Sequence, residues 1–283
     1  MLENGPKITV ISAVYNSSKT LERCLKSFAR QDYPHKELIV VDGGSSDGSV
    51  DIIAKYEHMI SYWESKPDRG VYHAWNKALD HCTGEWIHFV GSDDIYHAPD
   101  ALSRAANWLR ACRSDVRVAY GYVAVVNETG DFLEMRGCPW PAAKIALRKE
   151  MSLLHPGVFH HRSLFEMHGK FDEDFRIAGD YEFLLRELKS GEALFMPDVV
   201  VTATTVGGLS STPGLTVTLR REDAKARKIN GLPPYPLGWW ASYVKAHLYG
   251  LIGMVVGKET AIKVRNLYRK AVGQSGVPRN DDL

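Results

Sequence analysis

The sequence predicts an α/β fold: a Rossmann-like mixed, mostly parallel sheet flanked by helices, with a helical C-terminal extension. Three observations lead to it. Short, β-branched apolar runs alternate with amphipathic helical segments between residues 8 and 90. These runs are apolar throughout, as expected for strands covered on both faces. Polar side chains gather where the runs end, and parallel sheets bind ligands at the carboxyl ends of their strands.

The N-terminal half gives the clearest pattern. Residues 8–14 (ITVISAV) predict a buried strand, and residues 37–42 (ELIVVD) a second one that runs into the turn-rich GGSSDGS. The amphipathic segment 20–30 between them has Leu21, Leu25 and Phe28 on one helical face. The remaining elements expected here are a helix over 50–56, a strand over 60–64, a helix over 71–79 and a strand over 86–90.

The C-terminal half predicts a less regular order. Residues 99–113 indicate a helix, and residues 118–126 and 132–135 a hairpin whose turn is 127–130. A helix over 180–190 and a strand over 193–202 follow.

The bulk composition is that of a soluble globular protein, with 45% hydrophobic and 24% charged residues among 283. The net charge of +1 is unevenly spread: residues 220–279 carry twelve Lys and Arg against three Asp and Glu, while residues 1–219 carry 23 against 29. We therefore divide the chain into a catalytic-type domain, 1–219, and a basic, aromatic-rich helical extension, 220–283. A basic segment of this kind suits an anionic surface.

Two features indicate a cytoplasmic location. The four cysteines are widely spaced and contain no CxxC, so they suggest neither a zinc site nor a disulfide framework. The N-terminal MLENGPKITV lacks the basic and apolar regions of a signal peptide.

The extension contains an apolar stripe at helical spacing within residues 236–257. It has about the length of a membrane span, but Lys245 in its middle would cost roughly 3 kcal/mol at a bilayer centre. Tryptophans, tyrosines and a following basic segment favour a helix lying on the membrane surface through residues 236–270. The alternative is a helical pair packed on the body of the protein. No nucleic-acid-binding signature accompanies the charge.

Three acidic stretches are candidates for chemistry, and each has a structural alternative. Asp42 ends a strand and either accepts hydrogen bonds from a nucleotide or holds a turn. Asp93 and Asp94 are neighbouring like charges, which either water or a divalent cation stabilises. Mg²⁺ is typically coordinated by one or two carboxylates together with phosphate oxygens of the substrate. Asp180 is either a helix N-cap or a general base. Neither a dinucleotide fingerprint nor a P-loop is present.

Three ordered segments together resemble the family 2 inverting glycosyltransferases, which have the GT-A fold. They are ITVISAVYNSSKTLERCLKSFARQDYPHKELIVVDGGSSDGS, DRGVYHAWNKALDHCTGEWIHFVGSDD and HPGVFHHRSLFEMHGKFDEDFRIAGDYEFLLRE. The resemblance covers about residues 7–210 and leaves out the extension. Many relatives have an acid at the position of Gly91, and related sequences often have one at His73.

The resemblance implies a nucleotide-diphosphate sugar donor and a Mg²⁺ or Mn²⁺ ion. Asp180 would be the catalytic base, Asp93 and Asp94 would hold the metal, and His155 and Tyr181 would line the acceptor site. The donor would contact Ala13, Tyr15, Asn16, Asp42, Asp68, Arg69, Asn76, Ser92 and Asp93.

The expected activity is transfer of a hexosyl or N-acetylhexosaminyl group to a hydroxyl, as in bacterial members that build polysaccharide on a lipid carrier at the inner face of the cytoplasmic membrane. A non-catalytic scaffold that binds nucleotide sugars is the alternative. The presence of both Asp93 and Asp180 favours the enzyme.

Overall fold

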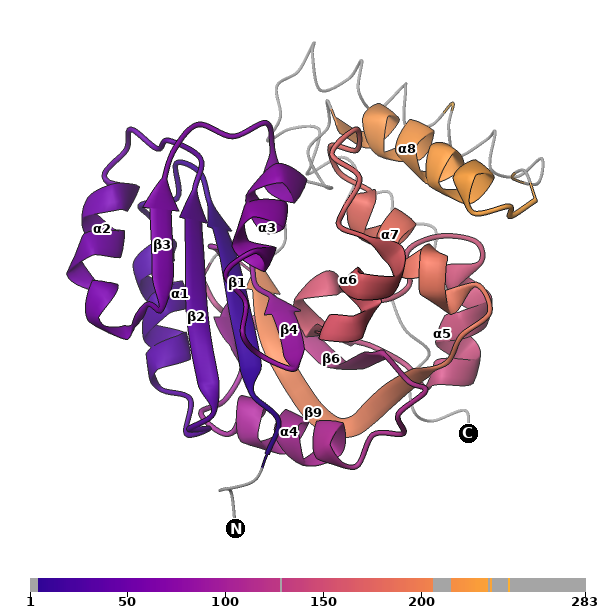
Figure 1. The fold of residues 1–283 in the computed structure, drawn as a ribbon, viewed down its shortest axis with the longest axis horizontal. Coiled ribbons are helices and arrows are strands. Elements are labelled where there is room, and N and C mark those ends of the chain that lie inside the picture. Colours follow the sequence, from indigo (N-terminus) through magenta and orange to yellow (C-terminus); the bar gives the residue numbers. More distant parts are fainter. Residues whose placement is uncertain (1–4, 128, 206–214, 234, 236–243, 245–283) are drawn as a thin grey trace.

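A mixed sheet covered by helices on both faces forms the body of the protein in the computed structural model, which describes residues 5–127, 129–205, 215–233, 235 and 244 (Figure 1). The strands run in the order β3-β2-β1-β4-β8-β6-β9-β5, and β7 pairs with β6. They are β1 (Ile8–Val14), β2 (Lys36–Asp42), β3 (Tyr62–Ser65), β4 (Trp86–Phe89), β5 (Ile95–Tyr96), β6 (Val118–Val126), β7 (Phe132–Arg136), β8 (Val158–His161) and β9 (Ala193–Thr205).

Eight α-helices and two 3₁₀ turns connect these strands in the described part of the chain. The helices are α1 (Leu21–Ala29), α2 (Ser49–Lys55), α3 (Val71–Leu79), α4 (Ala101–Arg110), α5 (Trp140–Leu147), α6 (Arg162–His168), α7 (Gly179–Leu188) and α8 (Thr216–Ile229). The 3₁₀ turns are η1 (Glu57–Met59) and η2 (His155–Gly157).

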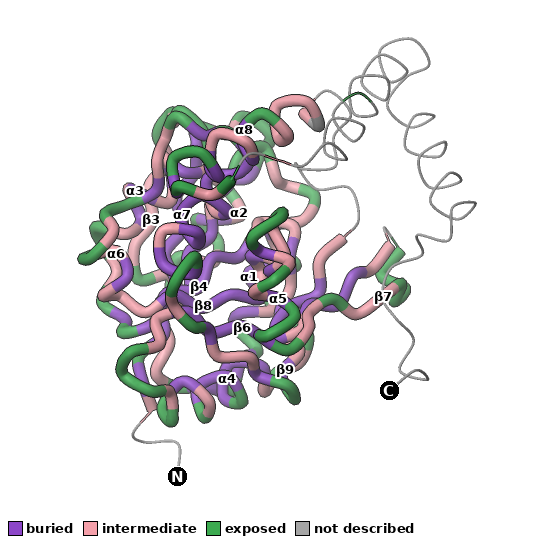
Figure 2. Tube along the Cα trace, turned by 90° about the vertical axis from the view of Figure 1, so that its right-hand side faces the viewer, coloured by how far each residue is buried: buried purple, intermediate pink, exposed green. Residues whose placement is uncertain are grey.

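The core has two halves, one on each face of the sheet. Alternate side chains of a strand point to opposite faces. Accordingly Ile11 and Ile39 pack with α3, α5, α6 and α7, whereas Val10 and Val40 pack with α1, α2 and α4. Figure 2 shows the buried central strands beneath a more exposed outer layer. Because both faces are covered, the strands read as continuous apolar runs in the sequence.

The first four strands in spatial order are parallel, and their register places their ends at one edge. Val14 of β1 pairs with Asp42 of β2, and Asp42 in turn pairs with Ser65 of β3. On the other side of β1, Ile11 pairs with Phe89 of β4. The direction changes at β8, which is antiparallel to both β4 and β6. The predicted mixed α/β fold is confirmed.

The predicted elements of the N-terminal half all form, with ends that differ by a few residues, and the β6–β7 hairpin is present. The sequence analysis missed β5, α5, β8, α6 and α8. Strand β5 has two residues, too few for a periodic pattern. Strand β8 (VFHH) contains a histidine pair, of which His160 is fully buried, so its burial does not show as an apolar run.

The predicted boundary between residues 219 and 220 falls inside α8, which packs against α7. The division into a domain and an extension stays a prediction, and the apolar stripe of 236–257, apart from Val244, lies outside the described residues. Among the helices that the structure describes, none has both the length and the apolar character needed to cross a bilayer.

Candidate active site

Three loops meet at the carboxyl edge of the parallel strands. Asn16, which follows β1 and has a φ of 47°, donates its N–H to Ser45 Oγ at 2.8 Å. Its Oδ1 accepts the N–H of Ser46 at 3.0 Å. Ser92, after β4, donates its hydroxyl to Ser17 Oγ at 2.8 Å. The ends of β1, β2 and β4 are therefore joined by hydrogen bonds, and the predicted convergence of polar residues is confirmed.

Asp42 holds the loop that follows β2. Its carboxylate is fully buried, and Oδ2 accepts hydrogen bonds from the N–H groups of Gly44 and Ser45 at 3.0 and 2.9 Å and from Ser65 Oγ at 2.6 Å. This is the turn geometry that the sequence left as one of two alternatives. A contact between Asp42 and a nucleotide stays a prediction. Tyr15 at the same edge is 66% exposed.

Asp68 and Arg69 precede α3 and lie beside this loop. A Cβ on Gly43 would come within 2.6 Å of Asp68 Oδ2, so the close approach of the two loops requires a residue without a side chain at 43. Asp68 Oδ1 accepts the N–H of Gly70 at 2.9 Å. The exposed Arg69 forms an ion pair with Glu173. Both residues are thus placed at the edge where the donor is expected.

Asp93 and Asp94 differ in environment. Asp93 is partly exposed, and its backbone carbonyl accepts a hydrogen bond from Arg23 at 3.3 Å. Asp94 is 3% exposed; its Oδ2 accepts the N–H of Gly91 at 3.0 Å, while Oδ1 is buried without a hydrogen-bond partner in the described residues. Burial, and then the charge of Asp93, raises the pKa of Asp94 to about 7.

These residues fit a divalent cation. Two adjacent carboxylates, one with a buried oxygen that lacks a hydrogen-bond partner in the described residues, repel one another, and Arg23 and the N–H of Gly91 offset this repulsion only in part. Mg²⁺ and its relatives complete such a site with phosphate oxygens of the substrate. In the described part of the chain, no group of three or more His, Cys, Asp or Glu side chains could hold a metal alone. The cation would accordingly depend on the donor's phosphates.

Asp180 lies in the first turn of α7 and is partly exposed. Its Oδ1 accepts the N–H of Tyr181 at 2.9 Å and contacts the hydroxyl of Tyr72 from α3 at 3.2 Å. The helix N-cap is Ala178, and no side chain of that residue caps the helix. Asp180 is therefore not the N-cap, and the capping alternative is wrong.

The surroundings of Asp180 favour a proton acceptor. Desolvation raises the pKa of Asp180 to about 6, the charge of Glu222 adds to this rise, and the hydrogen bonds from Tyr181 and Tyr72 oppose it. A carboxylate with a pKa near the working pH is suited to general-base catalysis.

Three predicted site residues have structural contacts. Asn76 donates to the carbonyl of Phe171 at 2.9 Å and accepts the N–H of Phe171 at 3.0 Å, so its amide closes α3 onto that segment. Tyr181 is 1% exposed and donates its hydroxyl to a main-chain carbonyl. His155 is 8% exposed and stacks on Trp75 with ring centroids 4.9 Å apart. Contact of Tyr181 or His155 with an acceptor would need a change in packing.

Sequence reasoning missed Tyr72 and Glu222. Tyr72 has the spacing of an ordinary core residue of α3, and nothing local marks its contact with Asp180. Glu222 lies beyond residue 219, in the part that was assigned to the extension on its net charge. Only the packing of α8 against α7 reveals it.

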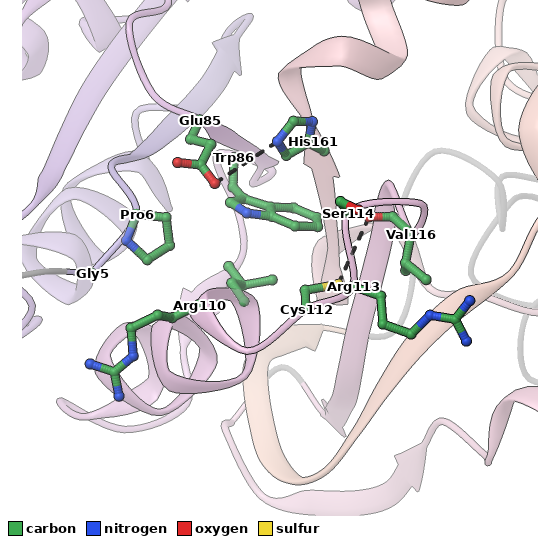
Figure 3. Close-up of a pocket in the computed structure, with 11 residues that line it drawn as sticks. Gly5, Pro6, Glu85, Trp86, Arg110, Cys112, Arg113, Ser114, Val116 and His161 are labelled. Carbon is green, nitrogen blue, oxygen red and sulfur yellow. Dashed lines mark hydrogen bonds and ion pairs between the residues drawn. The ribbon is translucent and has the colours of Figure 1, made fainter.

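A cavity of about 400 Å³ lies at the opposite edge of the sheet, lined by residues before β1, at the start of β4 and at the end of α4 (Figure 3). The indole of Trp86 and the side chain of His161 face it, and Glu85 contacts His161 at 3.9 Å. None of the three acidic stretches reaches this edge. The cavity is thus separate from the candidate active site.

Comparison with known proteins identifies the family of the chain. Residues 9–166, more than half of the chain, match the family model described as "Glycosyl transferase family 2". A "PGL/p-HBAD biosynthesis glycosyltransferase" of Mycobacterium bovis (strain BCG / Pasteur 1173P2) is 29% identical over 215 residues, which cover 74% of this chain and 80% of that protein.

Two solved structures share the fold. S. aureus TarS 1–349 in complex with UDP-GlcNAc matches with a TM-score of 0.59 and 24% identity, over 78% of this chain and 66% of that one. The match spans 39% of a longer TarS chain. Mannosyltransferase PcManGT from Pyrobaculum calidifontis, in complex with GDP-Man and Mn²⁺, matches with a TM-score of 0.61 and 22% identity. The match covers 98% of this chain and 78% of that one. On the family match and this shared fold, the chain belongs to glycosyl transferase family 2 and has a fold of the GT-A type.

Proposed function

We propose that the protein moves a hexosyl or N-acetylhexosaminyl group from a nucleotide-diphosphate sugar to a hydroxyl acceptor, with inversion at the anomeric carbon and Asp180 as the base. The environment of Asp180 carries this proposal. It is a partly exposed carboxylate that does not cap its helix, and its pKa is raised by desolvation to about 6. A helix-capping or salt-bridged aspartate would instead have a lowered pKa.

The donor side is supported by the joined loops after β1, β2 and β4. These loops present Tyr15 and Asn16 on one side and Ser92 and Asp93 on the other. In the related fold, TarS binds UDP-GlcNAc and PcManGT binds GDP-Man. We infer that the nucleotide and diphosphate lie along this edge, where ligands of open α/β sheets bind.

In the proposed reaction, Asp180 accepts the proton of an acceptor hydroxyl. The hydroxyl oxygen forms a bond to the anomeric carbon from the face opposite the nucleotide, and the bond from that carbon to the diphosphate oxygen breaks. The electron pair leaves with the nucleoside diphosphate, and one displacement inverts the configuration. The hydrogen bond from the N–H of Tyr181 fixes one carboxylate oxygen of Asp180, which leaves the other for the acceptor.

Asp93 and Asp94 are the residues that would hold a Mg²⁺ or Mn²⁺ ion. When bound, such a cation acts as a Lewis acid that stabilises the negative charge developing on the leaving diphosphate. Asp93, being partly exposed, is the carboxylate placed to meet the donor's phosphates. Asp94, which is buried against the N–H of Gly91, fixes the shape of the loop.

For the acceptor, we propose a saccharide on a lipid carrier. The support is the basic, aromatic composition of residues 236–270, which suits the surface of the cytoplasmic membrane at its inner face. The M. bovis relative is described by its name as a PGL/p-HBAD biosynthesis glycosyltransferase. Attachment of the extension to the membrane would bring a lipid-linked hydroxyl within reach of Asp180.

Replacing Asp180 with Asn should lower kcat by roughly 10²–10⁴-fold, because an amide cannot accept the proton. The donor KM should change little, since Asp180 meets the acceptor. Release of UDP from UDP-GlcNAc or GDP from GDP-mannose measures turnover, and the exposed Asp174→Asn is the control. In the wild type, kcat/KM should fall as the pH drops below about 6, where Asp180 becomes protonated. Wild-type turnover of Asp180→Asn would show that another group is the base.

Replacing Asp93 with Ala should weaken the joint binding of Mn²⁺ and UDP by at least about tenfold, because a metal-binding carboxylate is lost. A thermal-shift titration reads this directly, since a ligand bound to the native state raises its stability. Asp115→Ala, which removes an exposed carboxylate far from this edge, should leave the titration unchanged. Equal Mn²⁺-dependent shifts in both variants would contradict the assignment.

Replacing Asn76 with Ala should destabilise the protein by roughly 2–4 kcal/mol, because the buried N–H and C=O groups of Phe171 lose their partner. Urea unfolding measures this loss, and the exposed Asn107→Ala should be neutral. Nucleotide binding, measured where the variant is folded, then decides whether Asn76 also contacts the donor. Lost binding with unchanged unfolding would mean that Asn76 acts only as a ligand.

The extension is tested with vesicles. The full-length chain should sediment with vesicles of anionic phospholipid, and a chain ending at residue 235 should not, because the basic and aromatic residues that contact the surface are gone. Added salt should release the full-length chain. Melting curves confirm that the shortened chain is folded. Equal and weak sedimentation of both chains would exclude the membrane contact.

A further inference from the structure

A carboxylate from α8 holds the segment that leads into α7. Glu222 Oε1 accepts the N–H of Arg176 at 2.8 Å, and Oε2 accepts the N–H groups of Ile177 and Ala178 at 2.8 and 2.9 Å. These are three consecutive main-chain donors at the start of a helix, where negative charge is favoured. Glu222 is 9% exposed, so the three bonds replace most of its water. Glu222 therefore fixes the main chain immediately before α7, up to its N-cap residue Ala178.

The fixed segment also determines where Asp180 lies. Tyr72 donates its hydroxyl to the carbonyl of Ile177 at 2.6 Å, and the same oxygen is 3.2 Å from Asp180 Oδ1. Gly179 lies against the ring of Tyr72, and a Cβ there would come within 2.7 Å of it. The main chain of 177–179 is thus held between Tyr72 on one side and Glu222 on the other.

We propose that Glu222 is a positioning residue for sugar transfer: its three main-chain hydrogen bonds fix the segment before Asp180 and thereby the orientation of that carboxylate. The charge of Glu222 also favours the protonated form of Asp180. The inference rests on the proposed function, in which Asp180 is the base. It assigns a catalytic contribution to α8, which begins only three residues before the boundary that the sequence suggested.

The charges around Asp180 are consistent with this role. Tyr72 faces it from α3, the N–H of Tyr181 from α7, and Glu222 and Asp223 from α8. On α8, Arg220 contacts Asp223 at 3.5 Å. Burial raises the pKa of Asp223 to about 7. Desolvation is the main cause that raises the pKa of Asp180, and the charge of Glu222 adds a smaller contribution in the same direction.

Two substitutions separate geometry from charge. Glu222→Gln removes the charge, so Asp180 should become a weaker base, and the acidic limb of the kcat/KM profile should move to lower pH by about 0.5 unit or more. Glu222→Asp keeps the charge but shortens the side chain by one methylene. Its acidic limb should stay in place, while kcat falls by roughly 10–100-fold through misplacement of Asp180. The donor KM should change little in both.

The matched control is Glu37→Gln. Glu37 is also buried and accepts several hydrogen bonds, from Thr9 and Thr83, but it lies at the opposite edge of the sheet. It should lower the melting temperature without moving the acidic limb. Nucleoside diphosphate release from UDP-GlcNAc and GDP-mannose with Mn²⁺ provides the readout for all variants. If Glu222→Gln does not fold, the kcat of Glu222→Asp decides the positioning role.

The Asp180→Asn variant distinguishes the two ways of failing. If it is inactive while Glu222→Gln keeps the wild-type kcat and the wild-type acidic limb, the inference about Glu222 is overturned and the base assignment stands. An acidic limb that moves equally in Glu222→Gln and Glu37→Gln would also overturn it, because the shift would then follow from lost stability. If Asp180→Asn retains wild-type turnover, the proposed function and this inference fall together.

Discussion

The register of β1 between its two parallel neighbours is the constraint on which the site depends. Val14 pairs with Asp42 on one side, and Ile11 pairs with Phe89 on the other. A slip of one residue would turn every side chain of β1 to the other face. Two separate apolar clusters cover those faces, so such a slip would expose both. The loops after β1, β2 and β4 consequently end at one edge, close enough for the hydrogen bonds of Asn16 and Ser92 to join them.

The sequence predicted the N-terminal half well for the same physical reason. Strands β1, β2 and β4 are covered on both faces and give largely apolar runs, with helical segments between them. The C-terminal half lacks this regularity. His160 in β8 is fully buried with aromatic neighbours. A buried histidine is polar in any pattern analysis, so β8 and the helix that follows it give no periodic signal.

The candidate site was predictable in its residues but not in their roles. Spacing could not choose between a turn and a nucleotide contact for Asp42, or between a cap and a base for Asp180. Hydrogen bonds resolve the structural part of each choice: Asp42 holds its turn, and Asp180 does not cap α7, whose preceding main chain is held by Glu222. Glu222 and Tyr72 come from elements far from Asp180 in sequence. Residues that meet only through tertiary packing leave no mark on a local pattern.

The candidate site contains two pairs of acidic residues, Asp93 with Asp94 and Asp180 with Glu222. The groups that offset the negative charge differ between the two pairs. Beside Asp93, the ionised form of Asp94 is costly, because burial removes its water and the charge of Asp93 repels it. A cation is the natural compensation for that pair, and Gly91 contributes no third carboxylate to hold it. Near Asp180, three main-chain N–H groups donate to Glu222, so its carboxylate oxygens have hydrogen-bond partners without a metal. Repulsion between carboxylates thus favours metal binding at Asp93 and Asp94, and it favours proton uptake by Asp180.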